Sequence, residues 1–270
     1  MGKEFTCLQC GKCCKDSREE NYKSKDAEFI RDFLINVNHI SLGLFDWEVD
    51  EFRKINDSLD TEMLDVRIAN VVFNIKDNIS IITHYTYNRN PKCAFLTKDN
   101  TCSIYHNRPI ICRMWPCPYG KFQPKQARSS SKICKAELPL NELNKELDIK
   151  RLDNSRQHIS EKLKQKLIIR YKKCFYFRCI FDEINEMIMT FIEEQIKQGK
   201  IKPAKTGYNT DFLLKRIRNN PKVDFSDYYF KETGLRFDDF VKQAYNEKNM
   251  TKALEKTIPM KSTKSIVVTY

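Results

Sequence analysis

Four cysteines near the N-terminus, Cys7, Cys10, Cys13 and Cys14, are the most chemically distinctive feature of this 270-residue chain. Two residues between successive cysteines let the chain turn so that both sulfurs reach one metal, and Gly11 removes a Cβ where the chain curls further. Bacterial ferredoxins space their first three cluster ligands in the same way, so this run admits an iron-sulfur cluster as well as zinc. Cys13 and Cys14 are adjacent, and adjacent side chains of an extended segment point to opposite sides, so they do not readily bind one ion. Either a second metal lies across the backbone or one of the two is a supporting thiol, and further ligands are expected from elsewhere.

A second group of cysteines lies between residues 91 and 135 and comprises Cys93, Cys102, Cys112, Cys117 and Cys134. The surrounding sequence is dense in cysteine, proline and aromatic residues, and its periodic runs are too short for long helices or strands. The N-terminus does not read as a secretion signal, so we expect a cytoplasmic protein with reduced thiols. An odd total of 11 cysteines also favours metal binding over disulfides.

The same stretch is strongly basic, with nine lysines and arginines against the single acid Asp99, in a chain of net charge +12. These cations either lower thiol pKa values and offset the negative charge of a thiolate metal site, which we favour, or contact the phosphates of a nucleic acid. Arg108 and Arg113 flank Cys112, and we predict that they donate hydrogen bonds to thiolates or cluster sulfides. The alternative is that they pair with acidic side chains of the N-terminal third.

The cysteine pattern resembles the YkgJ-type cysteine-cluster family, also called the CxxCxxCC family. The resemblance covers about residues 4 to 136 and includes Cys93-Ala-Phe-Leu, Cys102-Ser-Ile-Tyr and Arg108-Pro-Ile-Ile-Cys112-Arg113 followed by Pro116. It implies eight ligands for zinc or iron: Cys7, Cys10, Cys13, Cys14, Cys93, Cys102, Cys112 and Cys134. Cys117 departs from the family pattern, which leaves the choice between Cys117 and Cys134 open. Flagellin lysine N-methylases carry a related pattern, which implies redox or methyl-transfer chemistry.

Other residues with metal-binding side chains receive ordinary structural interpretations. His106 lies near the ligands, but eight cysteines leave little need for it, and the remaining histidines, including His84, are expected at the surface or half-buried. Cys174 and Cys179 lie among aromatic residues, where thiols usually pack as small apolar groups. The chain contains none of the common phosphate-loop, dinucleotide, serine-hydrolase or zinc-protease motifs, so those activities have no local support.

Hydrophobic periodicity and turn residues predict the elements that position these cysteines. Helical spacing predicts helices over residues 26–38, 45–55, 155–173, 179–198, 210–219 and 236–247. Two runs rich in β-branched and aromatic residues, 68–75 and 79–87, predict a β-hairpin. Residues 199–209 have the composition of a linker.

We therefore expect an α+β protein that is mainly helical. A cysteine-rich, metal-organised module with a small β-hairpin is expected over residues 1–136, and a helical extension of unknown role over residues 137–270. The expected function is chelation of an iron-sulfur cluster or iron through cysteine thiolates. The alternative is a structural zinc module that presents a basic surface to nucleic acid or to a protein partner. No apolar run is long enough to cross a bilayer, so no membrane partner is expected.

Overall fold

A computed structural model of the chain describes residues 14, 28–38, 42–59, 64–88, 92–115 and 172–244. The chain divides into two compact units. Unit 1 comprises Met1–Arg18 and Arg89–Phe181, and unit 2 comprises Glu19–Asn88 and Asp182–Tyr270. The predicted boundary near residue 136 lies outside the described residues and stays a prediction.

The centre of unit 2 is the predicted hairpin, which the structure confirms as β4 (Val66–Asn74) and β5 (Ile79–Tyr87). Val71, Val72 and Ile81 are fully buried, as expected for β-branched side chains that fit a pleated surface. Asn78 adopts a positive φ of 57° in the connecting turn, a conformation that asparagine tolerates better than most residues. Local sequence signals therefore predict the hairpin. The other strands of the sheet pair with it directly or, for the outermost strand, through a neighbouring strand.

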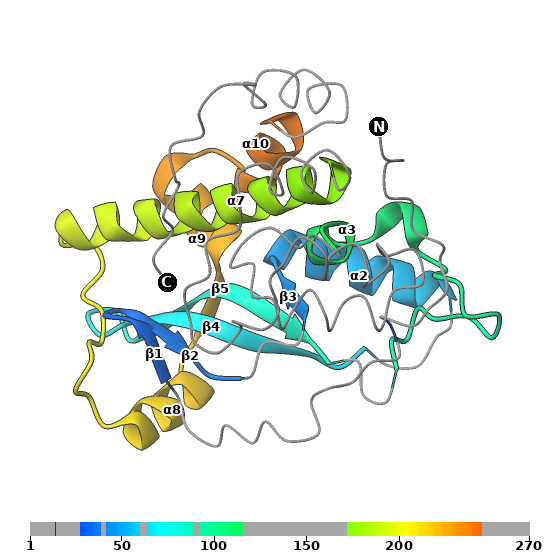
Figure 1. Cartoon of the computed structure of the whole chain (residues 1–270). Coiled ribbons are helices and arrows are strands. Elements are labelled where there is room, and N and C mark those ends of the chain that lie inside the picture. Colours follow the sequence, from blue (N-terminus) through cyan, green and yellow to red (C-terminus); the bar gives the residue numbers. More distant parts are fainter. Residues whose placement is uncertain are drawn as a thin grey trace, which may run out of the picture. The chain divides into compact units, whose positions relative to one another are not determined.

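Four shorter strands complete a six-stranded sheet of order β1-β2-β4-β5-β3, with β6 also paired to β5 (Figure 1). The additional strands are β1 (Glu28–Arg31), β2 (Leu34–Asn36), β3 (Leu42–Leu44) and β6 (Lys222–Asp224). β3 pairs antiparallel with residues 85–87 of β5, whereas β6 pairs parallel with residues 80–82. Because β4 occupies the other edge of β5, β3 and β6 share one edge and leave residues 83 and 84 between them.

The helix predicted over residues 26–38 is wrong, because this segment forms the antiparallel pair of β1 and β2. Ile35 is fully buried and pairs with Val71 of β4, whereas Ile30, which the helical pattern assigned to the buried face, is 41% exposed. Pairing with a strand that is distant in sequence has overridden the local helical spacing.

Helices cover the sheet, and several match the predicted ones. These are α2 (Asp46–Leu59), α7 (Lys172–Lys197), α8 (Thr210–Asn219), α9 (Phe225–Thr233) and α10 (Phe237–Ala244). In unit 2, α7, α9 and α10 lie together on one side of the sheet and α8 lies on the other (Figure 1). The helices predicted over 45–55, 179–198 and 210–219 are confirmed, as is the described part of that over 236–247. Residues 155–171 lie outside the described residues.

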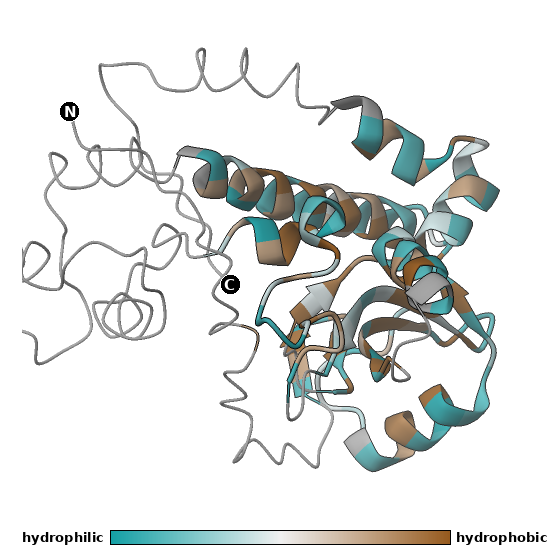
Figure 2. Cartoon of the chain, turned by 90° about the vertical axis from the view of Figure 1, so that its right-hand side faces the viewer, coloured by the Kyte–Doolittle hydropathy of each residue, from teal (hydrophilic) through white to brown (hydrophobic). Residues whose placement is uncertain are grey.

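Apolar contacts hold α7, α9 and α10 in place. In α7, Ile184, Ile188 and Ile192 are fully buried at a spacing of four residues, and Figure 2 shows alternating hydrophobic and hydrophilic bands along this helix. The ring of Phe225 on α9 packs 5.8 Å from that of Phe191 on α7 and 5.0 Å from that of Phe237 on α10. Every helix in the described ranges is too short or too polar to cross a membrane.

The linker predicted over residues 199–209 is wrong, because this segment packs against the end of β4. Ile201 and Ala204 are buried, and the amide of Ile75 donates to the carbonyl of Lys202 at 2.8 Å. The fully buried side chain of Asn74 accepts a hydrogen bond from the amide of Lys202 at 2.9 Å. A glycine- and lysine-rich composition is typical of linkers, but backbone hydrogen bonds to the end of β4 and the Asn74 side chain hold the segment against the core.

A buried polar pair links β5 to α7 within unit 2. His84 was expected at the surface or half-buried, and this prediction is wrong, because the side chain is buried with Nε2 2.5 Å from Oδ1 of Asn185. Its Nδ1 lies 3.2 Å from the hydroxyl of Thr83. Burial lowers the pKa of His84 to about 4, and the hydrogen bond to Asn185 opposes this shift only in part.

The α+β class is thus confirmed, while the expected division into an N-terminal module and a helical extension is only partly correct. β6 comes from the C-terminal half of the chain and joins a sheet built by the N-terminal half. Its three residues, Lys222–Asp224, are too few to give a periodic signal. The C-terminal half therefore contributes to the sheet itself and does not only extend the chain with helices.

Candidate metal centre

In unit 1, the end of the N-terminal cysteine run lies beside the first cysteine of the second group. The amide of Cys93 donates a 3.0 Å hydrogen bond to the carbonyl oxygen of Cys14. Cys14 is half-buried and Cys93 is buried, so the two residues meet in a partly water-excluded environment. Spacing alone could not show this proximity, which the predicted metal centre requires.

Cys93 and Cys102 are held by one small hairpin-like loop. The amide of Leu96 donates to the carbonyl of Cys93 at 3.0 Å, and Leu96 forms an antiparallel bridge with Cys102. Asn100 turns the loop with a φ of 63°, and Phe95 fills its interior with 1% of its surface exposed. Backbone hydrogen bonds within a short loop, and not a long helix or strand, therefore hold Cys93 and Cys102 close together.

Cys112 lies in a single helical turn, α3 (Ile110–Arg113), that follows the 3-10 helix η2 (Tyr105–Asn107). Pro109 precedes α3 with a φ of −60°, which suits the start of a helix, and its carbonyl accepts from the amide of Cys112 at 2.9 Å. The amide of Tyr105 donates to the carbonyl of Cys102 at 3.2 Å. Backbone hydrogen bonds therefore tie Cys102 to the start of η2 and, separately, form the turn that carries Cys112.

The two arginines of this segment hold the backbone around Cys112. Arg108 donates from Nε to the carbonyl of Tyr105 at 2.9 Å, and its guanidinium lies 3.9 Å from the centre of the Tyr105 ring. Arg113 donates from Nε to the carbonyl of Arg108 at 2.6 Å and from Nη2 to the carbonyl of His106 at 2.9 Å. These contacts make both side chains positioning groups for the turn. Donation to thiolates or sulfides stays a prediction.

The beginning of α7 contributes further side chains to unit 1. Cys174 is buried, as predicted, and its thiol donates to the carbonyl of Trp115 at 3.5 Å. Cys179 is exposed, so the prediction that it packs in the core is wrong. The guanidinium of Arg113 lies 5.4 Å from the centre of the Phe177 ring. Cys174, which sequence reasoning assigned only to packing, thus contacts Trp115, three residues after Cys112.

The structure describes part of the predicted ligand set. Cys14, Cys93, Cys102 and Cys112 belong to the described residues of unit 1, whereas Cys7, Cys10, Cys13, Cys117 and Cys134 lie outside them. Among the residues that the structure describes, no three His, Cys, Asp or Glu side chains converge on a common point suited to a metal. Thiolates are nevertheless the donors that zinc and iron prefer, so the donor chemistry fits either metal.

A comparison with family models supports metal binding in general. Residues 6–135 match the model of the CxxCxxCC family, described as a putative zinc- or iron-chelating domain. The matched range begins just before Cys7 and ends just after Cys134, so it contains every cysteine of the predicted centre. No curated protein and no solved structure matches the chain.

Proposed function

Because residues 6–135 of this chain match the CxxCxxCC family, we propose that it binds iron, as an iron-sulfur cluster, through cysteine thiolates of that range. The proposed ligands come from Cys7, Cys10, Cys13, Cys14, Cys93, Cys102, Cys112 and either Cys117 or Cys134. The observation that carries the proposal is the hydrogen bond between Cys93 and Cys14, because it supports the meeting of two cysteine groups that lie far apart in the chain.

The remaining residues of the segment support this chemistry. Arg108 and Arg113 hold the carbonyl groups before Cys112, so its thiol is presented from a turn with a restricted backbone. Their positive charges also favour the thiolate form that metal ligands require. When bound, an iron-sulfur cluster supplies electron-transfer chemistry. We propose a redox role on that basis, in the cytoplasm, where thiols stay reduced.

Nucleic-acid binding is not part of the proposal, because the two arginines of the basic segment that the structure describes are engaged with its own backbone. Lys92 and Lys98 are exposed in this segment, whereas Arg108 and Arg113 donate to carbonyl oxygens.

Elemental analysis together with an electronic spectrum tests the proposal. The full chain is purified without exposure to oxygen, and iron, zinc and acid-labile sulfide are counted for each polypeptide. The proposal predicts a brown protein that contains iron and sulfide, with absorption in the visible range that is lost on reduction. A colourless protein that contains stoichiometric zinc would keep the thiolate site and overturn the cluster and its redox role.

A further inference from the structure

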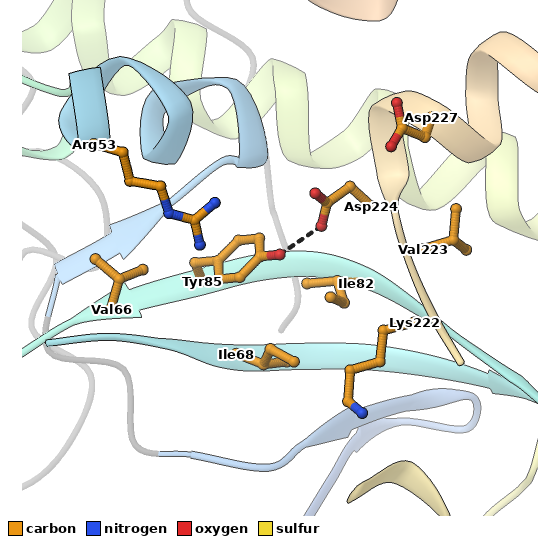
Figure 3. Close-up of a pocket in the computed structure, with 9 residues that line it drawn as sticks. All are labelled: Arg53, Val66, Ile68, Ile82, Tyr85, Lys222, Val223, Asp224 and Asp227. Atoms are coloured by element: carbon orange, nitrogen blue, oxygen red, sulfur yellow. Dashed lines mark hydrogen bonds between the residues drawn. The ribbon is translucent and has the colours of Figure 1, made fainter. Parts of the chain in front are cut away.

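Unit 2 contains an open cavity of about 410 Å³ above the β4–β5 hairpin, beside β6 and below helices α2 and α9 (Figure 3). It is lined by Arg53, Val66, Ile68, Ile82, Tyr85, Lys222, Val223, Asp224 and Asp227. Its volume falls in the range that small-molecule sites occupy, and its lining combines an apolar floor with a few polar groups, as such sites do. Every lining residue belongs to unit 2 and none is a cysteine, so this inference does not depend on the metal centre.

A local irregularity of β5 turns a tyrosine into the cavity. In a regular strand, residues 82 and 85 would point to opposite faces of the sheet. The register between β4 and β5 instead shifts on both sides of the Asn70 and His84 pair, and both Ile82 and Tyr85 line the cavity. Such bulges commonly redirect one side chain beside a functional site. Here the bulge brings the Tyr85 hydroxyl over a floor of apolar side chains.

Two carboxylates form one side of the cavity. The hydroxyl of Tyr85 donates to Oδ1 of Asp224 at 2.5 Å, and Asp227 follows in the first turn of α9 (Figure 3). Burial raises the pKa of Asp224, and repulsion by Asp227 and Asp50 adds to this, while the Tyr85 bond and Arg53 act in the opposite direction. A positively charged group placed between Asp224 and Asp227 would relieve this repulsion.

The guanidinium of Arg53 approaches the same space from α2 (Figure 3). Its ion pair is with Asp50, at 3.5 Å on the same helix, and within the described residues no ion pair joins Arg53 to Asp224. Both members of the Arg53 and Asp50 pair are more than half exposed, and such pairs contribute little, so the guanidinium can exchange Asp50 for a ligand carboxylate at small cost.

Lys222 also lines the cavity, but its ammonium is already hydrogen-bonded elsewhere. Its ammonium donates to the carbonyls of Arg218 and Asn220 at 2.9 and 3.2 Å, and it is therefore occupied at the end of α8. The aliphatic stem of Lys222 lines the cavity beside Val223, while its ammonium is bound to the two backbone carbonyls at the end of α8. The cation that remains for a ligand in this lining is Arg53.

We propose that this cavity binds a small zwitterion of the α-amino-acid type with an aliphatic side chain. The ligand's ammonium lies at Asp224 and Asp227, its carboxylate at Arg53, and its side chain on Val66, Ile68 and Ile82. A ligand with only a positive charge would leave its apolar end facing Arg53, and one with only a negative charge would face two carboxylates. A zwitterion meets both signs of charge across the apolar floor.

Titration of the full chain with three probes of similar size tests this proposal. The probes are norvaline, n-butylamine and n-butyrate, and binding is measured by calorimetry at neutral pH. Norvaline is expected to bind at least about tenfold more tightly than either singly charged probe, because it makes both charged contacts. Absence of norvaline binding at millimolar concentration, or equal affinity for n-butylamine or n-butyrate, would overturn the proposal.

Charge-removing variants test the assigned contacts. Arg53→Gln and Asp227→Asn should each weaken norvaline binding about tenfold to a hundredfold. The matched controls Arg67→Gln and Asp239→Asn remove exposed charges outside the lining and should leave it unchanged. Because Arg53 and Asp227 are exposed, melting temperatures without ligand should change little. Norvaline binding that survives both lining substitutions would contradict the proposed contacts.

Discussion

The backbone amide of Cys93 donates a hydrogen bond to the carbonyl oxygen of Cys14, at 3.0 Å, although the whole β4–β5 hairpin lies between these residues in the sequence. The bond places the last residue of the N-terminal cysteine run next to the loop that carries Cys102. It also explains how a family pattern that is split along the chain can correspond to one centre. The proposals for unit 1 depend on this contact.

Arg113 should influence how long a bound metal stays in place. Arg113→Gln removes the guanidinium bonds to the carbonyls of Arg108 and His106, which frees the turn before Cys112. Loss of groups that position metal ligands typically weakens metal binding about tenfold to a hundredfold. The measurement is the rate at which the bound metal transfers to a coloured chelator, and we expect that rate to rise about tenfold.

Two further variants separate geometry from charge at this position. Arg113→Lys keeps the charge but not the paired donors of the guanidinium, so it should release metal nearly as fast as Arg113→Gln. Lys98→Gln removes an exposed charge from the same segment and should behave as the unmodified protein. If Arg113→Lys instead retained metal fully, charge rather than the backbone bonds would explain the role of Arg113.

Asp46 should make the protein more stable in mild acid. Its carboxylate accepts hydrogen bonds from the amide and the hydroxyl of Ser226, at 2.7 and 2.9 Å, but burial outweighs these bonds and raises its pKa to about 6. Because the folded state holds this proton more tightly, the contribution is present below pH 3.8 and is lost as the pH rises through 6.

The expected size of the Asp46 effect is up to about 3 kcal/mol in the free energy of unfolding. Urea denaturation of the unmodified protein and of Asp46→Asn between pH 4 and 7 measures it. The stability of the unmodified protein relative to the variant should fall between pH 4 and 6 and then stay level. Parallel stability curves would show that Asp46 is ionised with an ordinary pKa.

His84 should act in the opposite direction over an overlapping pH range. Burial lowers its pKa from 6.5 to about 4, so the folded state resists protonation that the unfolded chain accepts. Stability is therefore lost as the pH falls from 6.5 to 4, by up to about 3 kcal/mol. In His84→Gln this loss should be absent, whereas His106→Gln, at an exposed position, should retain it. Equal acid sensitivity in all three proteins would contradict a buried, neutral His84.

Asn74 should contribute strongly to the stability of unit 2. Its fully buried amide donates to Asp77 at 2.8 Å and accepts from the amides of Lys202 and Lys76 at 2.9 and 3.2 Å. Asn74→Ala leaves these partners without their bonds and should lower the free energy of unfolding by about 3 kcal/mol. Asn219→Ala, at an exposed position of α8, should cost less than about 0.5 kcal/mol. Similar denaturation midpoints for the two variants would rule out this role of Asn74.

The elements that sequence reasoning found are those whose signals are local. The β4–β5 hairpin joins two β-branched runs through a short turn, and α8 has a side-chain cap, since Asn209 accepts from the amide of Phe212 at 3.0 Å. By contrast, β1 and β2 were predicted as one helix, because their apolar residues happen to follow helical spacing. Pairing with each other and with β4, as of Ile35 with Val71, decides their structure.

The site features that sequence reasoning missed depend on contacts between distant segments. The cavity of unit 2 requires β6 to pair in parallel with β5, so that Asp224 reaches Tyr85. Neither residue belongs to a recognisable motif. The cysteines proposed as metal ligands were predicted from spacing and family resemblance, but their spacing could not reveal that the backbones of Cys14 and Cys93 are hydrogen-bonded. Spacing also could not reveal that Arg108 and Arg113 donate to backbone carbonyls, and their predicted donation to thiolates or cluster sulfides stays a prediction.

The most direct test of the central claim is the metal content of Cys93→Ser, measured against the unmodified protein and Cys179→Ser after purification without oxygen. Cys93 lies where the two cysteine groups meet, whereas Cys179 is an exposed thiol outside the predicted ligand set. If both groups hold one centre, the unmodified protein and Cys179→Ser should contain equal amounts of iron, or of zinc, and Cys93→Ser should lose most of it. Full metal content in Cys93→Ser, or a metal-free unmodified protein, would contradict the claim.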